Sequence, residues 1–434
     1  MDRKRRSVSA GTVFMLFLVV LVLGGSAWVL TRLSGGRNVD LNRVVTSVMK
    51  LSSGEKQEIE NIRIQQEPGE KPAEPTPTVK PAAGMFPSDA ETGTAARTFT
   101  LTAGGTAAIE TEVRRSCYSN DSKKYDFSDI MIPLKNAVSA DLSTFFFENT
   151  LSDEFKVSTT IIPTAGADLP VSAGFGTAAC GFAKAYDKGQ SGIDETRKAL
   201  ENRGIIPLGI RSRDQGEEEL FEANGIRISL QQYTGTLTAT VKKNMTKDGN
   251  EDAVPAADIE TIRNGIRSAK EHGADAVVVM IQWGKDGKNV DKKQKELAQQ
   301  IAEAGADLII GAGSRIPQET EMLQVAGEDG KNRQVLCAYS LGTLISDNRG
   351  NAKRLGSYLL HVTFRKENGA VSIVSMEYTP VYCWRYKQDG RFFYRCVPIG
   401  DTVPDGMDAE QQKVMGKALK AVTDALESSP LTAR

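Results

Sequence analysis

The side chains that most often do chemistry in proteins are scarce in this sequence. Histidine occurs only as His272 and His361, so a histidine-rich metal site is excluded by number alone. The cysteines contain no CxxC pair and no zinc-type spacing. They are Cys117, Cys180, Cys337, Cys383 and Cys396. A nucleophilic thiol needs a nearby base, and neither histidine lies in a recognisable motif.

Acidic residues beside apolar runs are the remaining candidates for chemistry. Asp141 and Glu148 flank the apolar run 142–147, and Asp187 precedes a stretch with helical spacing. Two carboxylates that lie close together can act as general acid and base. The same residues can instead cap helices or tie down loops, and the sequence gives no distance between them.

Elements able to position these acids begin near residue 97, where strand-like and helix-like segments start to alternate. Apolar runs predict strands at 99–103, 142–147, 226–230, 276–281, 308–311, 335–339, 359–364 and 371–378. Helical spacing predicts helices at 193–202, 259–270, 291–304 and 409–426. Glycines stop the first three helices. This alternation indicates a layered α/β fold.

A tight turn is predicted where Asp389-Gly390 stands between aromatic flanks. If these two residues form the turn, Gln388 pairs with Arg391, and counting outward places Cys383 opposite Cys396. In a non-hydrogen-bonded pair of this kind the Cα atoms approach to about 4.5 Å, which a disulfide tolerates. We expect a bridge in an oxidising compartment, with two buried thiols as the alternative.

The N-terminus has the pattern of a membrane anchor. Four cations at 3–6 precede a run without charges from Gly11 to Leu30, long enough to cross a bilayer as a helix. The cations predict a cytoplasmic tail at 1–10, a transmembrane signal anchor at 11–31 and an extracytoplasmic remainder. Cleavage after small residues at 25–27 is the alternative, although the apolar run continues past that point.

A spacer is predicted between the anchor and the folded domain. The segment 32–96 begins with a short juxtamembrane stretch and continues as a Pro/Glu/Thr-rich linker without apolar periodicity. The folded domain is then expected at 97–400, with a C-terminal helix and tail at 401–434. The formal net charge of -1 gives no support for a nucleic-acid partner.

Several segments, taken in order, resemble the CapA family of bacterial capsule and poly-gamma-glutamate synthesis proteins. The clearest are Gln282-Trp283-Gly284 and the run Ala304 to Gly311, where family members carry His-Trp-Gly and a Gly-Ala-Asp-x-Ile-x-Gly motif. Tyr339 to Gly342 and the Asp187-x-Gly189 segment also match family motifs. The family belongs to the calcineurin-like metallophosphoesterases, so the resemblance implies a layered α/β/β/α sandwich.

The departures from the family pattern remove its metal ligands. Family motifs place Asp, Asn and His at strand ends, where two metal ions make a hydroxide nucleophile. Here those positions read Gly104-Gly105, Phe146-Phe147-Glu148, Phe182-Ala183-Lys184, Gln282, Gly313-Ser314-Arg315 and Thr343. These side chains offer few metal-binding atoms, and cations repel a metal ion. The resemblance therefore implies a pseudoenzyme without a metal, a cofactor or catalytic residues.

A remodelled cleft is the expected ligand site. Lys184 and Arg315 occupy former histidine positions, and an arginine fork suits carboxylate or phosphate groups. Solvated replacements at a decaying site are the alternative. The candidate residues are Glu148, Lys184, Asp187, Gln282, Trp283 and Arg315, although Trp283 is also typical of core packing.

The function expected from this resemblance is binding or scaffolding in capsule and cell-envelope polymer assembly, on the outer face of a bacterial membrane. The expected partners are an anionic envelope polymer or envelope-assembly proteins. An active CapA-type enzyme with an unrecognised site is the alternative.

Overall fold

The computed structural model describes residues 97–434 except 214–219, 236, 327–331 and 401–402. The predicted tail, anchor and linker at 1–10, 11–31 and 32–96 lie outside these residues. Among the residues described, no helix combines the length and apolarity needed to span a membrane.

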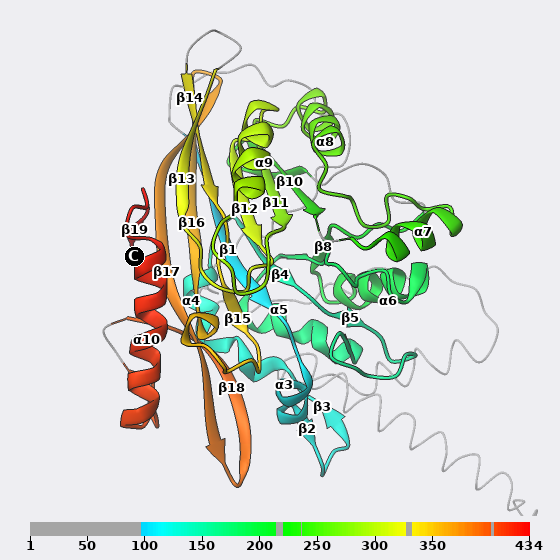
Figure 1. The fold of residues 1–434 in the computed structure, drawn as a ribbon, viewed down its shortest axis with the longest axis vertical. Helices are drawn as coiled ribbons and strands as arrows, with labels where there is room; N and C mark the ends of the chain where they lie inside the picture. Colours follow the sequence, from blue (N-terminus) through cyan, green and yellow to red (C-terminus); the bar gives the residue numbers. More distant parts are fainter. Residues whose placement is uncertain (1–96, 214–219, 236, 327–331, 401–402) are drawn as a thin grey trace, which may run out of the picture. The chain divides into compact units, whose positions relative to one another are not determined.

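Two sheets dominate this part of the chain (Figure 1). The larger has the order β18-β17-β16-β1-β4-β7-β8, with β15 beside β1 and β19 beside β17. Its strands are β1 Arg97–Ala107, β4 Leu142–Phe147, β7 Thr177–Ala179, β8 Ile206–Leu208, β15 Thr343–Ile345, β16 Gly356–Glu367, β17 Ala370–Gln388, β18 Arg391–Pro398 and β19 Thr432–Ala433. Two further small ladders join β2 Tyr118–Ser119 to β3 Lys124–Tyr125 and β5 Thr150–Leu151 to β6 Ile161–Ile162.

The second sheet has the order β13-β14-β12-β11-β10-β9. Its strands are β9 Leu220–Ala223, β10 Ile226–Thr234, β11 Ala276–Gln282, β12 Leu308–Ala312, β13 Thr320–Ala326 and β14 Asn332–Ala338. The helices are α3 Thr111–Ser116, α4 Lys135–Val138, α5 Asp168–Ala173, α6 Gly189–Glu201, α7 Ala239–Lys247, α8 Ile259–Glu271, α9 Lys292–Glu303 and α10 Ala409–Ala425.

Three hydrophobic cores place the sheets and helices in layers. In β11 every residue is buried, and alternate side chains enter different cores. Val278 and Met280 meet the apolar side chains of β1, such as Leu101, between the two sheets. Val277 and Val279 pack instead with Ile262 of α8 on the outer face. Another core joins the larger sheet to α5 and α6. The described residues therefore form the predicted α/β/β/α layers.

Parallel pairing aligns the strand ends that matter for a site. In the larger sheet β1, β4, β7 and β8 run parallel to one another. In the second sheet β10, β11, β12 and β14 do the same. The carboxyl ends of each group therefore lie at one edge, where α/β proteins commonly bind ligands.

The predicted hairpin is present with its predicted register. Asp389 and Gly390 have φ angles of 49° and 79°, as a type I′ turn requires. Gln388 pairs with Arg391, and Cys383 pairs with Cys396. Both cysteines are free, buried thiols in this structure. Their Sγ atoms donate to main-chain oxygens of the segment 344–346. The register is confirmed, and the bridge stays a prediction.

We expect the full chain, purified from an oxidising compartment, to contain a Cys383–Cys396 disulfide. The paired register supplies the geometry, and closing the hairpin covalently would stabilise the fold by up to about 3 kcal/mol. Burial raises the pKa of both thiols, so bridge formation should need an oxidant or a catalyst of exchange. Peptide mapping without reductant checks this. Alkylation of both thiols, as expected for the unpaired Cys337, would contradict it.

His361 lies inside the larger sheet, between two threonines. Its Nδ1 lies 3.0 Å from Thr102 Oγ1, and its Nε2 lies 2.9 Å from Thr379 Oγ1. The residue is 5% exposed. Burial, aided by Arg434, lowers the pKa of His361 to about 4. The imidazole is therefore neutral in the folded protein at neutral pH.

Acid should destabilise the fold through His361. Its pKa falls from 6.5 in the unfolded chain to about 4 in the folded one, so the stability is complete above pH 6.5 and declines toward pH 4. The full loss is at most about 3 kcal/mol. Urea unfolding between pH 4 and 7 measures it. His361→Gln should flatten the profile, whereas His272→Gln, at the exposed end of α8, should not.

Candidate functional site

A cavity of about 270 Å³ opens at the carboxyl ends of the parallel strands. Segments following β1, β4, β7 and β12 contribute to it, together with the last residue of β11. It therefore lies where the strand ends of both sheets meet. Its lining residues are Ala108, Glu110, Glu148, Thr159, Thr160, Phe182, Ala183, Lys184, Gln282, Gly313 and Arg315.

Arg315 links two carboxylates inside this cavity. Its Nη1 lies 3.1 Å from Glu110 Oε1, and its Nη2 donates to Glu148 Oε2. Burial alone would lower the pKa of Arg315, but the neighbouring charges of Glu148 and Glu110 raise it overall. The sequence predicted an arginine fork open to an anionic ligand. That expectation needs correction, because both arms of the fork already contact acids of the chain.

The backbone at Arg315 is unusual. Its φ of 57° lies in the left-handed region, which costs a residue with a side chain free energy. Thr343 Oγ1 donates to the Arg315 carbonyl oxygen at 2.9 Å. Thr343 is the residue at the position where the family motif has asparagine. Its hydroxyl therefore helps to hold the loop that carries the guanidinium.

Glu148 is the most buried charged group of the cavity, with its side chain 7% exposed. It comes directly after β4, whose six residues are all buried. Arg315 binds Oε2, while Oε1 is buried without a hydrogen-bond partner among the described residues. A buried carboxylate normally has hydrogen-bond partners on both oxygens, so Glu148 Oε1 can still accept a hydrogen bond or contact a cation.

Glu110 is a site residue that the sequence reasoning missed. It accepts hydrogen bonds from Ser346 Oγ at 2.6 Å and from the Asp347 backbone nitrogen at 3.0 Å. Burial opposes its ionisation, but Asp347, Ser346 and Arg315 together lower the pKa of Glu110. Burial and the hydrogen bond with Glu110 raise the pKa of Asp347 to about 6. The prediction ended the first strand at residue 103, whereas β1 continues to Ala107 and brings Glu110 to the cavity.

Lys184 lies at the rim of the same cavity and is exposed. The structure therefore brings Lys184 and Arg315 together in one cavity. The described residues provide no hydrogen bond or ion pair to the Lys184 ammonium group. Gln282 lines the cavity too, and its carbonyl oxygen accepts from the Gly235 nitrogen at 2.7 Å.

Two predicted site residues do not line the cavity. Trp283 is 4% exposed, stacks on the ring of Tyr339 and donates from Nε1 to the Tyr339 carbonyl oxygen at 2.9 Å. Asp187 is exposed in the turn before α6, where its backbone nitrogen donates to the Lys184 carbonyl oxygen. Asp141 binds the backbone nitrogen and hydroxyl of Thr100, so it ties β1 to the start of β4.

The residues present do not fit a two-metal site. Within the described ranges, no three His, Cys, Asp or Glu side chains are grouped to hold a metal ion. A Cβ atom at Gly105 would lie 2.5 Å from the Gly342 carbonyl oxygen. A Cβ at Gly313, where φ is 109°, would lie 2.1 Å from the Trp283 carbonyl oxygen. At both family ligand positions, backbone fills the space that a ligand side chain would need.

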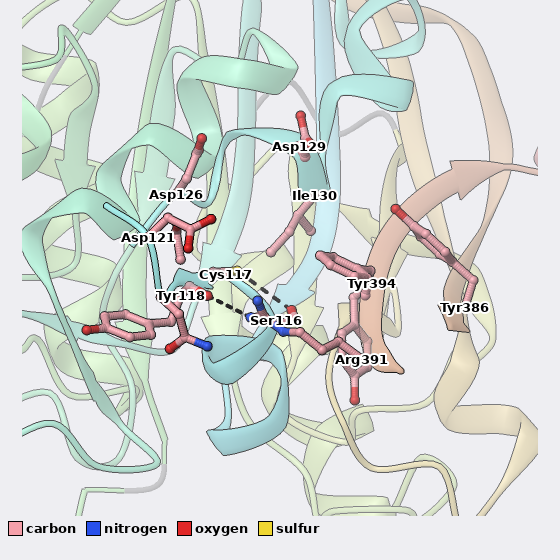
Figure 2. Close-up of a pocket in the computed structure, with 13 residues that line it drawn as sticks. Ser116, Cys117, Tyr118, Asp121, Asp126, Asp129, Ile130, Tyr386, Arg391 and Tyr394 are labelled. Atoms are coloured by element: carbon pink, nitrogen blue, oxygen red, sulfur yellow. Dashed lines mark hydrogen bonds between the residues drawn. The ribbon is translucent and has the colours of Figure 1, made fainter. Parts of the chain in front are cut away.

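A second, larger cavity of about 370 Å³ lies between the β17–β18 hairpin and the segment around β2. Figure 2 shows Arg391 and Tyr394 with Asp121 and Asp126 around it. Arg391 Nη2 donates to the carbonyl oxygens of Arg115 and Tyr118, at 3.1 and 2.6 Å. These two contacts of Arg391 join the hairpin to α3 and β2.

Known proteins resemble the chain over different lengths. A putative 5'-nucleotidase from Staphylococcus aureus, solved in complex with alpha-ketoglutarate, aligns over 74% of this chain and 58% of its own, with 11% identity and a TM-score of 0.38. The calcineurin-like phosphoesterase YfkN from Bacillus subtilis aligns over 77% of this chain and 99% of its own, with 11% identity and a TM-score of 0.37.

Sequence relatives are closer. The PGA biosynthesis protein CapA of Bacillus subtilis (strain 168) is 30% identical over 167 residues, which are 38% of this chain and 40% of that protein. The capsule biosynthesis protein CapA of Bacillus anthracis is 24% identical over 188 residues, 43% of each chain. The match thus spans less than half the length of these relatives. The family model described as bacterial capsule synthesis protein PGA_cap matches residues 100–348, and the chain belongs to this family.

Proposed function

We propose that this chain is a membrane-anchored, extracytoplasmic member of the capsule synthesis family that binds or scaffolds instead of catalysing. The observation that carries the proposal is the identity of the cation in the cavity. Where family motifs supply metal ligands, this chain has the guanidinium of Arg315 between Glu110 and Glu148. A guanidinium provides charge and hydrogen bonds but no activated water.

The packing around two glycines supports the loss of metal chemistry. Gly105 leaves room for the Gly342 carbonyl oxygen, which accepts a hydrogen bond from the Thr106 nitrogen at 2.9 Å. A carboxylate at position 105 would displace that contact. The loop at Gly313 is closed in the same way by the Trp283 backbone. Regaining the ligands would therefore require movement of the main chain.

The proposed ligand is an anionic envelope polymer, held at the cavity rim. Lys184 supports this proposal because its charge is exposed and the described residues do not pair it, whereas Arg315 is neutralised by two acids. Relatives are named for capsule and PGA biosynthesis. An envelope-assembly protein with an acidic surface would meet the same lysine.

The closure of the former ligand position can be tested at Gly105. Gly105→Ala should lower the free energy of unfolding by about 2 kcal/mol, and Gly105→Asp by at least about 3, because a charge is buried as well. Urea unfolding measures both. Gly176→Ala is the matched control, because its Cβ would meet its nearest neighbour at 3.9 Å. A stable Gly105→Asp protein that takes up manganese would contradict the proposal.

Binding tests the function itself. The full chain in detergent should bind poly-gamma-glutamate in the presence of EDTA, more weakly as salt rises, and should not bind neutral dextran. Lys184→Ala should weaken binding about threefold, as expected for one exposed charge. Lys198→Ala, on the exposed face of α6, is the matched control. Fluorescence anisotropy of labelled polymer measures the affinities.

The opposite results would favour the alternative, an active enzyme of the CapA type. Stoichiometric manganese, iron or zinc in the purified chain would indicate a metal site. Loss of polymer binding in EDTA would indicate that this metal is needed for binding. If Lys184→Ala binds the polymer as tightly as the unchanged protein does, the polymer does not bind at the cavity rim, contrary to the proposal.

A further inference from the structure

Three charged side chains that line the strand-end cavity contact one another: one arginine and two glutamates. Glu110 follows β1, Glu148 follows β4, and Arg315 follows β12 of the other sheet. Their side chains are 21%, 7% and 26% exposed. Charges this buried interact strongly, because little water screens them.

We propose that Arg315 is the resident cation of this cavity. Its guanidinium occupies the place between Glu110 and Glu148 and thereby keeps free cations, divalent metal ions included, away from those carboxylates. This role makes Arg315 a specificity-determining residue. The inference goes beyond the proposed function, because it holds whether or not the cavity rim binds a polymer.

The geometry supports a dedicated arginine position. The two Nη atoms contact different carboxylates, so the planar fork is used on both arms. The backbone adopts a φ of 57° to place the side chain there. Thr343 Oγ1 fixes the Arg315 carbonyl oxygen, and Ser314 Oγ donates to the Ile316 carbonyl oxygen at 2.8 Å. Strain of this kind persists only where surrounding contacts hold it.

The acids retain affinity for a cation beyond what Arg315 uses. Glu148 Oε1 is buried and has no hydrogen-bond partner among the described residues. A carboxylate with 7% of its side chain exposed cannot be satisfied by bulk water alone. Removing the guanidinium would leave two buried charges facing a cavity of about 270 Å³. A free cation that enters this space should then be bound.

The test uses the full chain in detergent with Arg315→Gly. Glycine accepts a φ of 57° without strain, so this variant removes the guanidinium and leaves the loop conformation favourable. Its thermal midpoint should fall below that of the unchanged protein. Guanidinium chloride at roughly ten times its dissociation constant should raise that midpoint by about 2 °C relative to sodium chloride of equal ionic strength. The unchanged protein should show no such rise.

Two controls locate the effect. Lys184→Ala removes a cation from the same cavity without freeing the acid pair, so guanidinium should not raise its midpoint. In the double variant Arg315→Gly with Glu148→Gln, the rise should disappear. If Arg315→Gly does not fold, Arg315→Asn also removes the cation and uses a residue that tolerates the left-handed region, and guanidinium should raise its midpoint.

Divalent cations provide the second arm. Manganese should raise the thermal midpoint of Arg315→Gly more than that of the unchanged protein. Adding Glu148→Gln to Arg315→Gly should abolish this extra rise. The absence of a guanidinium effect in each folded variant without the cation, Arg315→Gly or Arg315→Asn, would overturn the inference. Equal manganese effects on the variant and the unchanged protein would overturn it as well, because Arg315 would then not be what excludes the metal.

Discussion

A buried carboxylate needs a cation or hydrogen-bond donors beside it, and this requirement organises the strand-end cavity. Glu148 stands at the end of a strand whose residues are all buried, so its charge has little access to water. An isolated charge in such a place would cost several kcal/mol or become protonated. Arg315 meets the requirement with a guanidinium held between Glu148 and Glu110. The loops after β1, β4 and β12 are thereby tied to one another.

The same ion pairs mark the limit of what the sequence could predict. Helix ends and the hairpin were predictable because their signals are local. The Asp389-Gly390 turn fixes its register within a few residues, and Asp291 with Gln294 forms a capping box at the start of α9. The partners of Arg315 are 205 and 167 residues away in the chain. Composition and spacing contain no signal for such pairs, so the arginine was expected to face a ligand.

Strand length was the other source of error. Expecting the first strand to stop at residue 103 left Glu110 outside the predicted site, although β1 continues to Ala107. Gly104 and Gly105 interrupt the apolar run, and glycine is normally unfavourable in a strand interior. Here the backbone of Leu341 and Gly342, just before β15, approaches so closely that only glycine fits at position 105. The glycine at position 105 therefore hides the second half of β1 in the sequence, and it also lets the segment leading into β15 pack against β1.

Gly105 and Arg315, two departures from the family pattern, are linked through a series of contacts. Without a side chain at Gly105, the Gly342 carbonyl oxygen reaches the Thr106 nitrogen and sets β15 beside β1. β15 begins with Thr343, whose hydroxyl holds the loop of Arg315. Arg315 then neutralises the acids left at the strand ends. Restoring one ligand would break this chain of contacts before a metal could compensate, so single substitutions toward the family pattern should destabilise the fold. Under the proposed function, recognition is left to the rim of the cavity, where Lys184 is exposed to solvent.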